Sequence, residues 1–401
     1  MKVGVFLGGM SPIAGGGFTI SDDILEALVR VESKHRVVIF GSLTADQIIK
    51  LNARQIEVVS RRRYLLKIVI SRLMTTVSSF AMNLPILQNG LKVTHWVQRT
   101  LCDLGIELMW FITPYFFEVD VPFIFTIWDI QHRLQPWFPE VSRNGEWLRR
   151  EKFYSTAIRR ALAVIAGTEA GKAEIAKFYG VPPDRIRLIP HPSPAFALNA
   201  SKDTSTDVLT KYHIPEGYLF YPAQFWPHKN HVGLLLALSL LRENYGLKLP
   251  VVFVGTDWGN LKYVRQTADN LGLSSQTHFL GFVPRDDMIG LYRNAFALTY
   301  VTFFGPENLP PLEAFALGCP VIASNVAGSQ EQLGDAALLV DPKDEGQIAN
   351  AVKRLYNDPI LRDTLVARGI ARASKWTAED YVRSVLSIID DFEPIRRCWK
   401  R

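Results

Sequence analysis

Short β-branched runs that alternate with longer amphipathic stretches constrain the fold of this 401-residue chain most strongly. Helical patterns such as Ser21–Glu32 and Glu146–Leu162 separate the runs. An alternation of this kind predicts parallel sheets that are covered by helices on both faces. The runs expected to form buried strands are Val3–Leu7, Arg36–Phe40, Phe123–Ile127, Ala163–Ala166, Ile186–Ile189, Tyr218–Tyr221, Pro250–Val254, Thr277–Leu280, Ala297–Tyr300, Val321–Ala323 and Ala337–Val340.

The alternation is interrupted between Pro192 and Glu216 by a stretch rich in small, polar and turn-forming residues. We therefore predict an α/β chain of two doubly wound domains, at residues 1–195 and 216–376, with a linker at 196–215. A last helix, expected at Ala378–Asp391 within residues 377–401, could pack on either domain. Ligands bind beyond the carboxyl ends of strands in such sheets, so functional residues should follow strands and face a cleft between the domains.

The formal net charge of +6 is concentrated in one segment. Residues 58–102 contain seven Lys and Arg and no Asp or Glu, among many apolar side chains. Such a segment suits docking to anionic lipid headgroups, although a basic helix surface over its own core would have the same composition. Nucleic acid is disfavoured as a partner because no recognisable binding module accompanies the charge.

The cysteines and the N-terminus favour a cytoplasmic location. Cys102, Cys319 and Cys398 are widely spaced and give neither a disulfide framework nor a metal-binding pair. The first residues are too few and too broken by glycine to form a signal peptide, and no apolar window reaches the length of a membrane span. Residues 58–102 are the candidate for peripheral contact with a membrane.

Three consecutive glycines, Gly15, Gly16 and Gly17, lie between the first expected strand and the first helix. Glycines let a backbone approach a ligand closely, and a helix N-terminus offers N–H groups to an anion. A flexible turn without a ligand is the alternative. The dinucleotide fingerprint G-x-G-x-x-G does not fit this loop, and no acidic residue follows the second strand, which disfavours NAD.

Polar residues follow one expected strand in each domain. Asp129 and His132 could orient or deprotonate a hydroxyl, although a structural hydrogen-bonded pair would give the same pattern. Lys229 comes at the head of a helix, where its charge and the helix dipole suit a phosphate; a solvated surface charge is the alternative. No carboxylate or cysteine joins His228 and His231 in a metal site, so we expect no metal.

The segment from Thr302 to Asn325 is the most informative. A loop of Gly, Pro and Asn follows a strand, and a helix is expected to begin near Pro310 with Glu313 in its first turn. The N–H groups of that turn could bind a pyrophosphate, and the glutamate could accept hydrogen bonds from two ribose hydroxyls. An acidic first turn also simply suits the helix dipole.

These motifs, in this order, resemble glycosyltransferase family 4, whose members have the GT-B fold of two Rossmann-like domains. They transfer sugars from nucleotide donors with retention of configuration. The most specific match is Leu309–Ala314 followed by Gly318–Ser324. The variants around Asp129 and Lys229 look like a bacterial subgroup of mannosyl- and rhamnosyltransferases in surface-polysaccharide assembly.

The resemblance implies roles for the matching positions. Glu313 would hold the donor ribose and Lys229 its diphosphate. The N-terminal domain would bind the acceptor, with Trp128, Asp129 and His132 near it, and the last helix would cross back to this domain. Further donor contacts would come from the loop Gly15–Gly17, Gln224, the backbone at Val283, Glu307, and the backbone N–H groups around Asn308 and Leu309.

Three positions depart from the family pattern. Gly305 takes the place of the first of two glutamates eight positions apart, and Glu307 is the candidate to replace it. Gln224 stands where the family often has Arg or Lys, and Trp128 stands where it has His. The departures affect the donor-sugar contacts and any assisting base more than the fold or the reaction type.

The expected function is a metal-independent, retaining transfer of a hexosyl group from a nucleotide-diphosphate sugar, GDP-mannose or another. The acceptor would be a glycan or polyprenyl-linked glycan in bacterial polysaccharide or O-antigen synthesis, and no cofactor is expected. Residues 58–102 would touch the cytoplasmic face of the inner membrane. Two alternatives stay open: a nucleotide-sugar epimerase or phosphorylase of the same fold, and a non-catalytic assembly partner.

Overall fold

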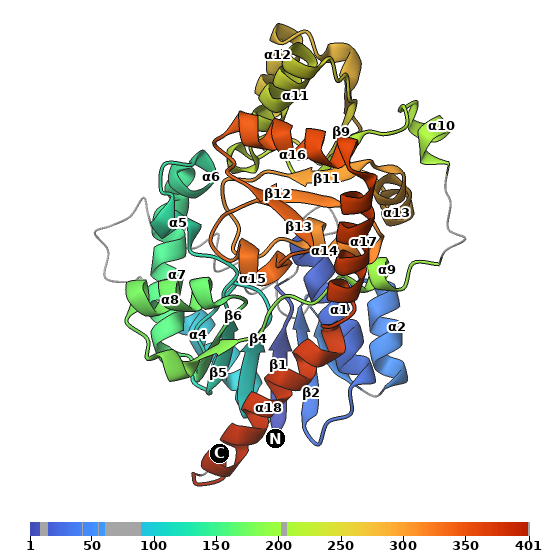
Figure 1. The fold of residues 1–401 in the computed structure, drawn as a ribbon. Coiled ribbons are helices and arrows are strands. Elements are labelled where there is room, and N and C mark those ends of the chain that lie inside the picture. Colours follow the sequence, from blue (N-terminus) through green and yellow to red (C-terminus); the bar gives the residue numbers. More distant parts are fainter. Residues whose placement is uncertain (9–14, 42, 55, 61–89, 202–206, 400–401) are drawn as a thin grey trace.

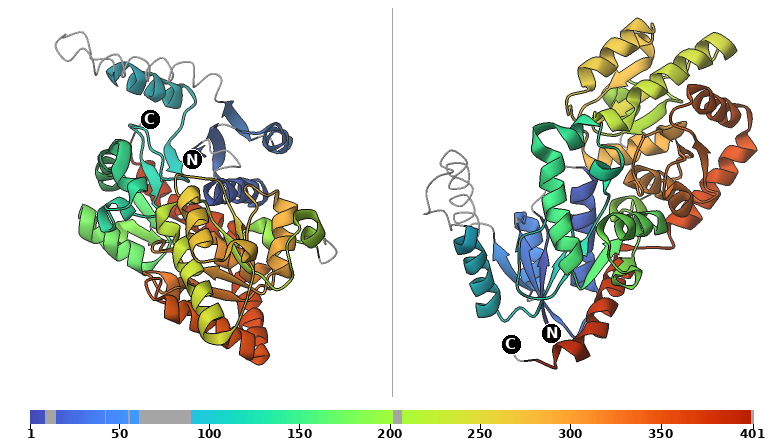
Figure 2. Two further views of the ribbon diagram at one scale, coloured as in Figure 1. Left: turned by 90° about the horizontal axis from the view of Figure 1, so that it is seen from above. Right: turned by 90° about the vertical axis from the view of Figure 1, so that its left-hand side faces the viewer.

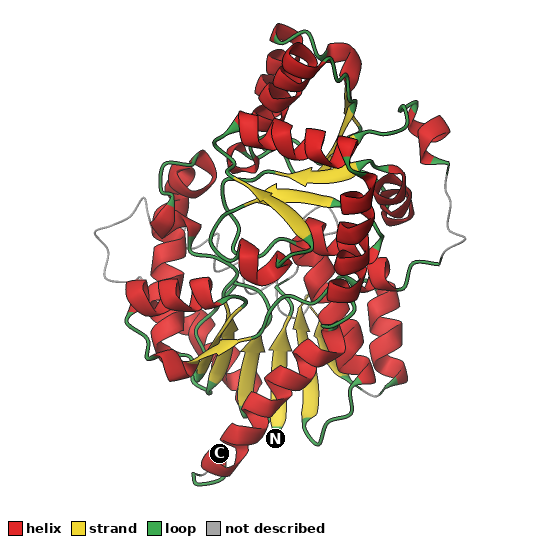
Figure 3. Ribbon diagram, viewed as in Figure 1, coloured by secondary structure: helices red, strands yellow, loops and turns green. Residues whose placement is uncertain are grey.

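The computed structural model describes residues 1–8, 15–41, 43–54, 56–60, 90–201 and 207–399. These residues form two α/β domains, one above the other in Figure 1, and each contains one parallel sheet. Figure 3 shows the two sheets in yellow with their helices in red. The α/β class and the two-domain organisation expected from the sequence are therefore confirmed.

The N-terminal domain contains seven parallel strands in the order β3-β2-β1-β4-β5-β6-β7. Its elements are β1 (Lys2–Phe6), α1 (Gly16–Arg30), β2 (Arg36–Gly41), α2 (Ala45–Ala53), β3 (Glu57–Ser60), α4 (Gly90–Asp103), β4 (Leu108–Phe111), β5 (Phe123–Thr126), α5 (Gln131–Leu134), α6 (Pro139–Ser142), α7 (Glu146–Arg160), β6 (Ala163–Ala166), α8 (Glu169–Tyr179) and β7 (Ile186–Leu188).

The C-terminal domain contains six parallel strands in the order β10-β9-β8-β11-β12-β13. Two short helices, α9 (Ala195–Leu198) and α10 (Val208–Tyr212), precede it. Its elements are β8 (Leu219–Pro222), α11 (His231–Tyr245), β9 (Val251–Val254), α12 (Leu261–Asn270), β10 (Thr277–Phe279), α13 (Arg285–Asn294), β11 (Ala297–Tyr300), α14 (Leu309–Ala316), β12 (Val321–Ser324), α15 (Ser329–Leu333), β13 (Ala337–Val340), α16 (Glu345–Asn357) and α17 (Pro359–Ala373).

Every strand expected from the sequence is present, to within one residue at each end. The structure adds two strands that the sequence reading missed, β3 at one edge and β4 in the centre of the N-terminal sheet. All four residues of β4 are buried, and it pairs with β1 and β5. Its apolar run, Leu108–Ile112, lies between Gly105 and Pro114, so turn residues bound it as they bound the strands that were expected.

The last helix, α18 (Ala378–Arg396), returns to the N-terminal domain and lies against α1 (Figures 1 and 2). The ring of Tyr381 stacks on Trp110 of the central strand β4, with 6.3 Å between centroids. Arg30 of α1 donates to Glu379 at 3.0 Å. Burial of Tyr381 against a strand of the first sheet ties the end of the chain to its beginning.

The basic segment at residues 58–102 lies largely outside the described residues. Of the helices that the structure describes, none combines the length and the apolar character needed to cross a bilayer. The expectation that the basic segment docks to a membrane therefore stays a prediction.

Candidate active site

A cleft with a volume of about 1480 Å³ lies where the two domains face each other. Its lining follows strands of both sheets, as doubly wound domains require. His132 is the one expected site residue that does not line it. Those that do are Gly15, Gly16, Gly17, Trp128, Asp129, Gln224, Lys229, Val283, Glu307, Asn308, Leu309 and Glu313.

Lys229 ends a single 3-10 turn, Pro227–Lys229, that lies just before α11. Its ammonium donates to the hydroxyl of Tyr300 at 2.9 Å and lies 5.2 Å from the centre of that ring. The hydroxyl of Tyr221 donates a hydrogen bond to the backbone carbonyl of Lys229. Asn230 takes a left-handed conformation with φ of 54° and caps α11 by accepting from Gly233. The lysine is thus fixed at the edge of the cleft, close to a helix N-terminus.

Glu313 lies in α14, where the structure corrects its expected position. The helix begins at Leu309, so Glu313 falls in the second turn and its carboxylate, rather than capping the helix, is buried. Burial raises the pKa of Glu313 to about 7, against smaller lowering effects of a hydrogen bond from Tyr292 and the charge of Arg285. The Tyr292 hydroxyl donates to Oε2 at 2.6 Å. Close to neutral pH the carboxyl is therefore partly protonated and partly ionised; the protonated form can donate a hydrogen bond, whereas the ionised form only accepts.

The loop before α14 explains why Gly305 departs from the family pattern. Gly305 has φ of +141°, and a Cβ placed on it would lie 2.6 Å from the Asn308 side chain. Asn308 Nδ2 donates to the Gly305 carbonyl at 2.9 Å, which closes the loop. The backbone N–H of Asn308 donates to Gln332 at 2.9 Å. The Asn308 N–H is thus used within the loop, and the expectation that N–H groups around Asn308 and Leu309 meet the donor phosphates or sugar stays a prediction.

Glu307 lines the cleft, but both of its carboxylate oxygens bind a residue of the other domain. Oε1 accepts from the backbone N–H of His191 at 2.7 Å, and Oε2 lies 2.7 Å from Nδ1 of the same residue. A Cβ on Gly167 would overlap the carboxylate, so only glycine admits this approach. A donor sugar would have to compete with His191 for Glu307.

On the acceptor side, Asp129 lies just before α5 and is held by the first residue of that helix and by Arg150 of α7. Its Oδ1 accepts from the backbone N–H of Gln131 at 2.9 Å and from Arg150 at 3.2 Å. Arg150 also donates to Glu146 at 2.8 Å. This network fixes the Asp129 carboxylate at the cleft without using its second oxygen in any of these bonds.

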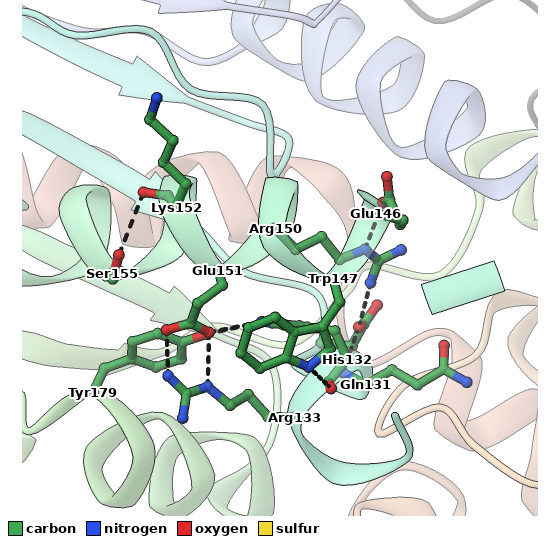
Figure 4. Close-up of polar contacts among 11 residues, drawn as sticks. Gln131, His132, Arg133, Glu146, Trp147, Arg150, Glu151, Lys152, Ser155 and Tyr179 are labelled. Carbon is green, nitrogen blue, oxygen red and sulfur yellow. Dashed lines mark hydrogen bonds and ion pairs between the residues drawn. The ribbon is translucent and has the colours of Figure 1, made fainter. Parts of the chain in front are cut away.

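His132 points away from the cleft, and the expectation that it faces the acceptor is wrong. Its side chain is fully buried, with Nε2 at 3.3 Å from Glu151 and 3.1 Å from the Tyr179 hydroxyl (Figure 4). Trp147 donates to its carbonyl at 2.6 Å. Burial and, to a smaller extent, the charge of Arg150 lower its pKa. His132 is thus a neutral core histidine that joins α5 to α7 and α8.

Several residues that shape the site were missed by sequence reasoning. Tyr300 and Tyr292 carry the two key polar contacts; Tyr300 ends β11, directly before the Thr302–Asn325 segment, and Tyr292 lies in α13 (Arg285–Asn294). Trp258 stacks on Trp226 with 4.7 Å between ring centroids, and Trp226 donates to Gln224 at 3.0 Å. An aromatic shelf on the donor side could have been suspected from tryptophans that closely follow two adjacent strands.

The two facing domains define the GT-B fold, and comparison with known proteins agrees. Residues 14–192 match the model of Glycosyltransferase Family 4, and residues 211–372 match that of Glycosyl transferases group 1. The two matches together span most of the chain. The chain belongs to the family 4 group of GT-B glycosyltransferases.

Relatives of this chain include O-antigen enzymes. It is 29% identical to the O-antigen chain mannosyltransferase B of Escherichia coli over 231 residues, 57% of this chain and 61% of that protein. It is 28% identical to the O-antigen chain mannosyltransferase RfbU of Salmonella typhimurium strain LT2, over 51% of this chain and 53% of that protein. The matches thus cover between about half and three fifths of these relatives.

Solved structures of low sequence identity share the whole fold. The Anabaena protein Alr3699/HepE, crystallised with UDP and glucose, superposes with a TM-score of 0.71 at 16% identity, covering 98% of this chain and all of that one. WaaG, described as a glycosyltransferase involved in lipopolysaccharide biosynthesis, gives 0.68 at 16% identity and covers 96% and 99%. At this identity the likeness concerns the fold.

Proposed function

We propose that the protein transfers a hexosyl group from a nucleotide-diphosphate sugar to a glycan or lipid-linked glycan during surface-polysaccharide synthesis. The observation that carries the proposal is the cleft itself. Lys229 and Glu313 of the C-terminal domain and Asp129 of the N-terminal domain line one cavity. A donor held on one side would there meet an acceptor held on the other.

The donor side supplies recognition and charge. Glu313 accepts hydrogen bonds from the ribose hydroxyls in its ionised form, and the Lys229 ammonium binds the diphosphate. As the bond from the sugar to the phosphate breaks, negative charge grows on the diphosphate. Lys229, already fixed by Tyr300, stabilises that charge without reorganisation, which is the largest contribution in many enzymes.

The transfer proceeds with retention on the leaving-group face. The bond between C1 and the phosphate oxygen breaks, the acceptor oxygen bonds to C1, and the hydroxyl proton passes to the departing diphosphate. This route uses no side-chain nucleophile, metal ion or cofactor. Asp129 orients the acceptor hydroxyl, and Arg150 and the Gln131 N–H hold Asp129 in place.

The names of the relatives indicate the class of donor and acceptor. Both enterobacterial relatives are described as O-antigen chain mannosyltransferases, so GDP-mannose is the first donor to test. UDP-sugars come next, because the Anabaena structure contains UDP. The acceptor would be a glycan or polyprenyl-linked glycan at the cytoplasmic face of the inner membrane, approached through residues 58–102.

A donor screen tests the proposal. Melting temperatures of the protein would be measured with GDP-, UDP- and dTDP-sugars, because a bound donor stabilises the folded state. The stabilising donor is then assayed for transfer to extracted lipid-linked glycans by the protein and by K229A and E313A. Unchanged transfer in both variants contradicts the site. Binding without turnover favours an assembly partner, and release of sugar phosphate or donor epimerisation without acceptor favours the enzymatic alternative.

A further inference from the structure

A segment of the N-terminal domain reaches across the cleft to the turn that carries Lys229. The segment contains α5 and α6, and Glu140 of α6 is its point of contact. Oε1 of Glu140 accepts a hydrogen bond of 3.2 Å from the backbone N–H of His228 and also binds Nδ1 of its ring. The side chains of Glu140 and His228 are 6% and 13% exposed, so solvent screens this pair little.

Near neutral pH the pair consists of an ionised carboxylate and a neutral imidazole. Burial, with a smaller effect of the neighbouring Lys229 charge, lowers the pKa of His228 to about 4. Burial raises the pKa of Glu140, but the interactions with His228 outweigh it, and the net shift is downward. Nδ1 of His228 therefore carries the ring hydrogen and donates a hydrogen bond to Glu140.

The C-terminal domain holds His228 from the opposite side. Its carbonyl accepts from the Thr302 hydroxyl at 3.0 Å and from the backbone N–H of Phe303 at 2.8 Å. The segment also touches this loop, because the ring of Phe138 stacks on Phe303 with 6.1 Å between centroids. The turn before Lys229 thus lies between hydrogen bonds from its own domain and a carboxylate from the other.

We propose that Glu140 is a positioning residue that aligns Lys229 through His228 when the two domains close. The inference rests on the proposed function, since it takes Lys229 as the group that binds the donor diphosphate. The Lys229 side chain extends from this turn to the hydroxyl of Tyr300, so a shift of the turn moves the ammonium away from that hydroxyl and from its place in the cleft. Glu140 touches no reacting group; it makes the geometry of the donor site depend on the acceptor domain.

The chain offers a matched control in Glu331 of α15. Its carboxylate also joins the domains, accepting from the backbone N–H groups of Glu169 at 2.6 Å and Ala170 at 3.1 Å, at the start of α8. None of these contacts involves the Lys229 turn. Loss of Glu331 weakens domain closure alone, whereas loss of Glu140 weakens closure and frees the turn.

The test measures affinity for GDP and UDP by calorimetry, together with the melting temperature of each ligand-free variant. E140A removes both hydrogen bonds to His228 and should weaken the binding of the better nucleotide about tenfold, because only the part of their energy that orients the Lys229 turn affects the nucleotide. E140Q should restore affinity to within about twofold, because its amide oxygen can accept from both N–H groups of His228. E331A should leave affinity within about twofold of the wild type.

Two results would overturn the inference: an unchanged affinity in E140A, or an equal loss in E140A and E331A, which would assign the whole effect to domain closure. K229A distinguishes this failure from that of the proposed function. If K229A weakens nucleotide binding and E140A does not, only the role of Glu140 is wrong; if neither does, the donor site is wrong. Should E140A fail to fold, E140D, one methylene too short to reach His228, replaces it.

Discussion

The hydroxyl of Tyr292 donates a hydrogen bond of 2.6 Å to Oε2 of Glu313, and both groups are buried. The bond favours the ionised carboxylate against a larger desolvation effect that holds its pKa at about 7. Only the ionised form accepts hydrogen bonds from two ribose hydroxyls. Donor binding should therefore strengthen as the pH rises through 7.

Y292F should move this dependence to higher pH. Without the phenol, the pKa of Glu313 rises, and less of the carboxylate is ionised at pH 7. Nucleotide affinity, measured by calorimetry between pH 6 and 9, should be weaker at pH 7 and approach the wild-type value at pH 9. E313Q serves as the control, since it has no carboxylate to titrate there. An unshifted midpoint in Y292F would show that another group controls binding.

K229M should lower the transfer rate by about 100- to 1000-fold, because it removes the charge opposite the leaving diphosphate while keeping an unbranched side chain that is only one atom shorter. Y300F, which removes the 2.9 Å partner of the ammonium but leaves its charge, should cost only about threefold. Initial rates at saturating donor give both numbers. A K229M enzyme with a tenth or more of the wild-type rate would remove Lys229 from the mechanism.

The strands, the domain order and the cleft position of nearly all expected site residues could be predicted, because each depends on local pattern. A buried parallel strand needs only a short apolar run with turn residues at its ends. Residues directly after such strands must lie at one edge of the sheet, which is why Asp129, Lys229 and Glu307 meet in the cleft. The central strand β4 carries the same signal, an apolar run between Gly105 and Pro114, so it too could be predicted from the sequence.

The direction of a side chain could not be predicted. His132 lies three residues after Asp129, but it belongs to α5 whereas Asp129 precedes that helix, and the two side chains point in different directions, toward Glu151 and toward the cleft. The partners of buried polar groups could not be predicted either, because they lie far away in the sequence. Tyr300 meets Lys229 and His191 meets Glu307 through contacts more than 70 residues apart in the chain.

H132A should affect stability and not catalysis. It removes a buried ring that contacts Glu151 and Tyr179, and it should lower the free energy of unfolding by roughly 2–4 kcal/mol. The rate per folded molecule should stay within about threefold of the wild type. D129N should have the opposite effect, a large loss of transfer rate with a small change in the free energy of unfolding. Urea denaturation and transfer assays on both variants separate the two roles, and a catalytic defect in folded H132A would restore the original expectation.

Asp23 of α1 predicts a stability effect with a defined pH dependence. Its Oδ2 accepts from the backbone N–H of Ala195 at 3.0 Å, and burial, the largest influence, raises its pKa from 3.8 to about 7. Between these values the folded protein binds more protons than the unfolded chain, so this group makes the free energy of unfolding fall as pH rises.

D23N keeps an oxygen acceptor for Ala195 and removes the charge. Its advantage over the wild type should be about 2–3 kcal/mol larger at pH 8 than at pH 5, at about 1.4 kcal/mol per pKa unit. Urea unfolding at both pH values measures it, and D335N is the control, because Asp335 is a surface carboxylate with 76% of its side chain exposed. A pH-independent difference between D23N and the wild type would mean that Asp23 is ionised in the folded protein over this whole range.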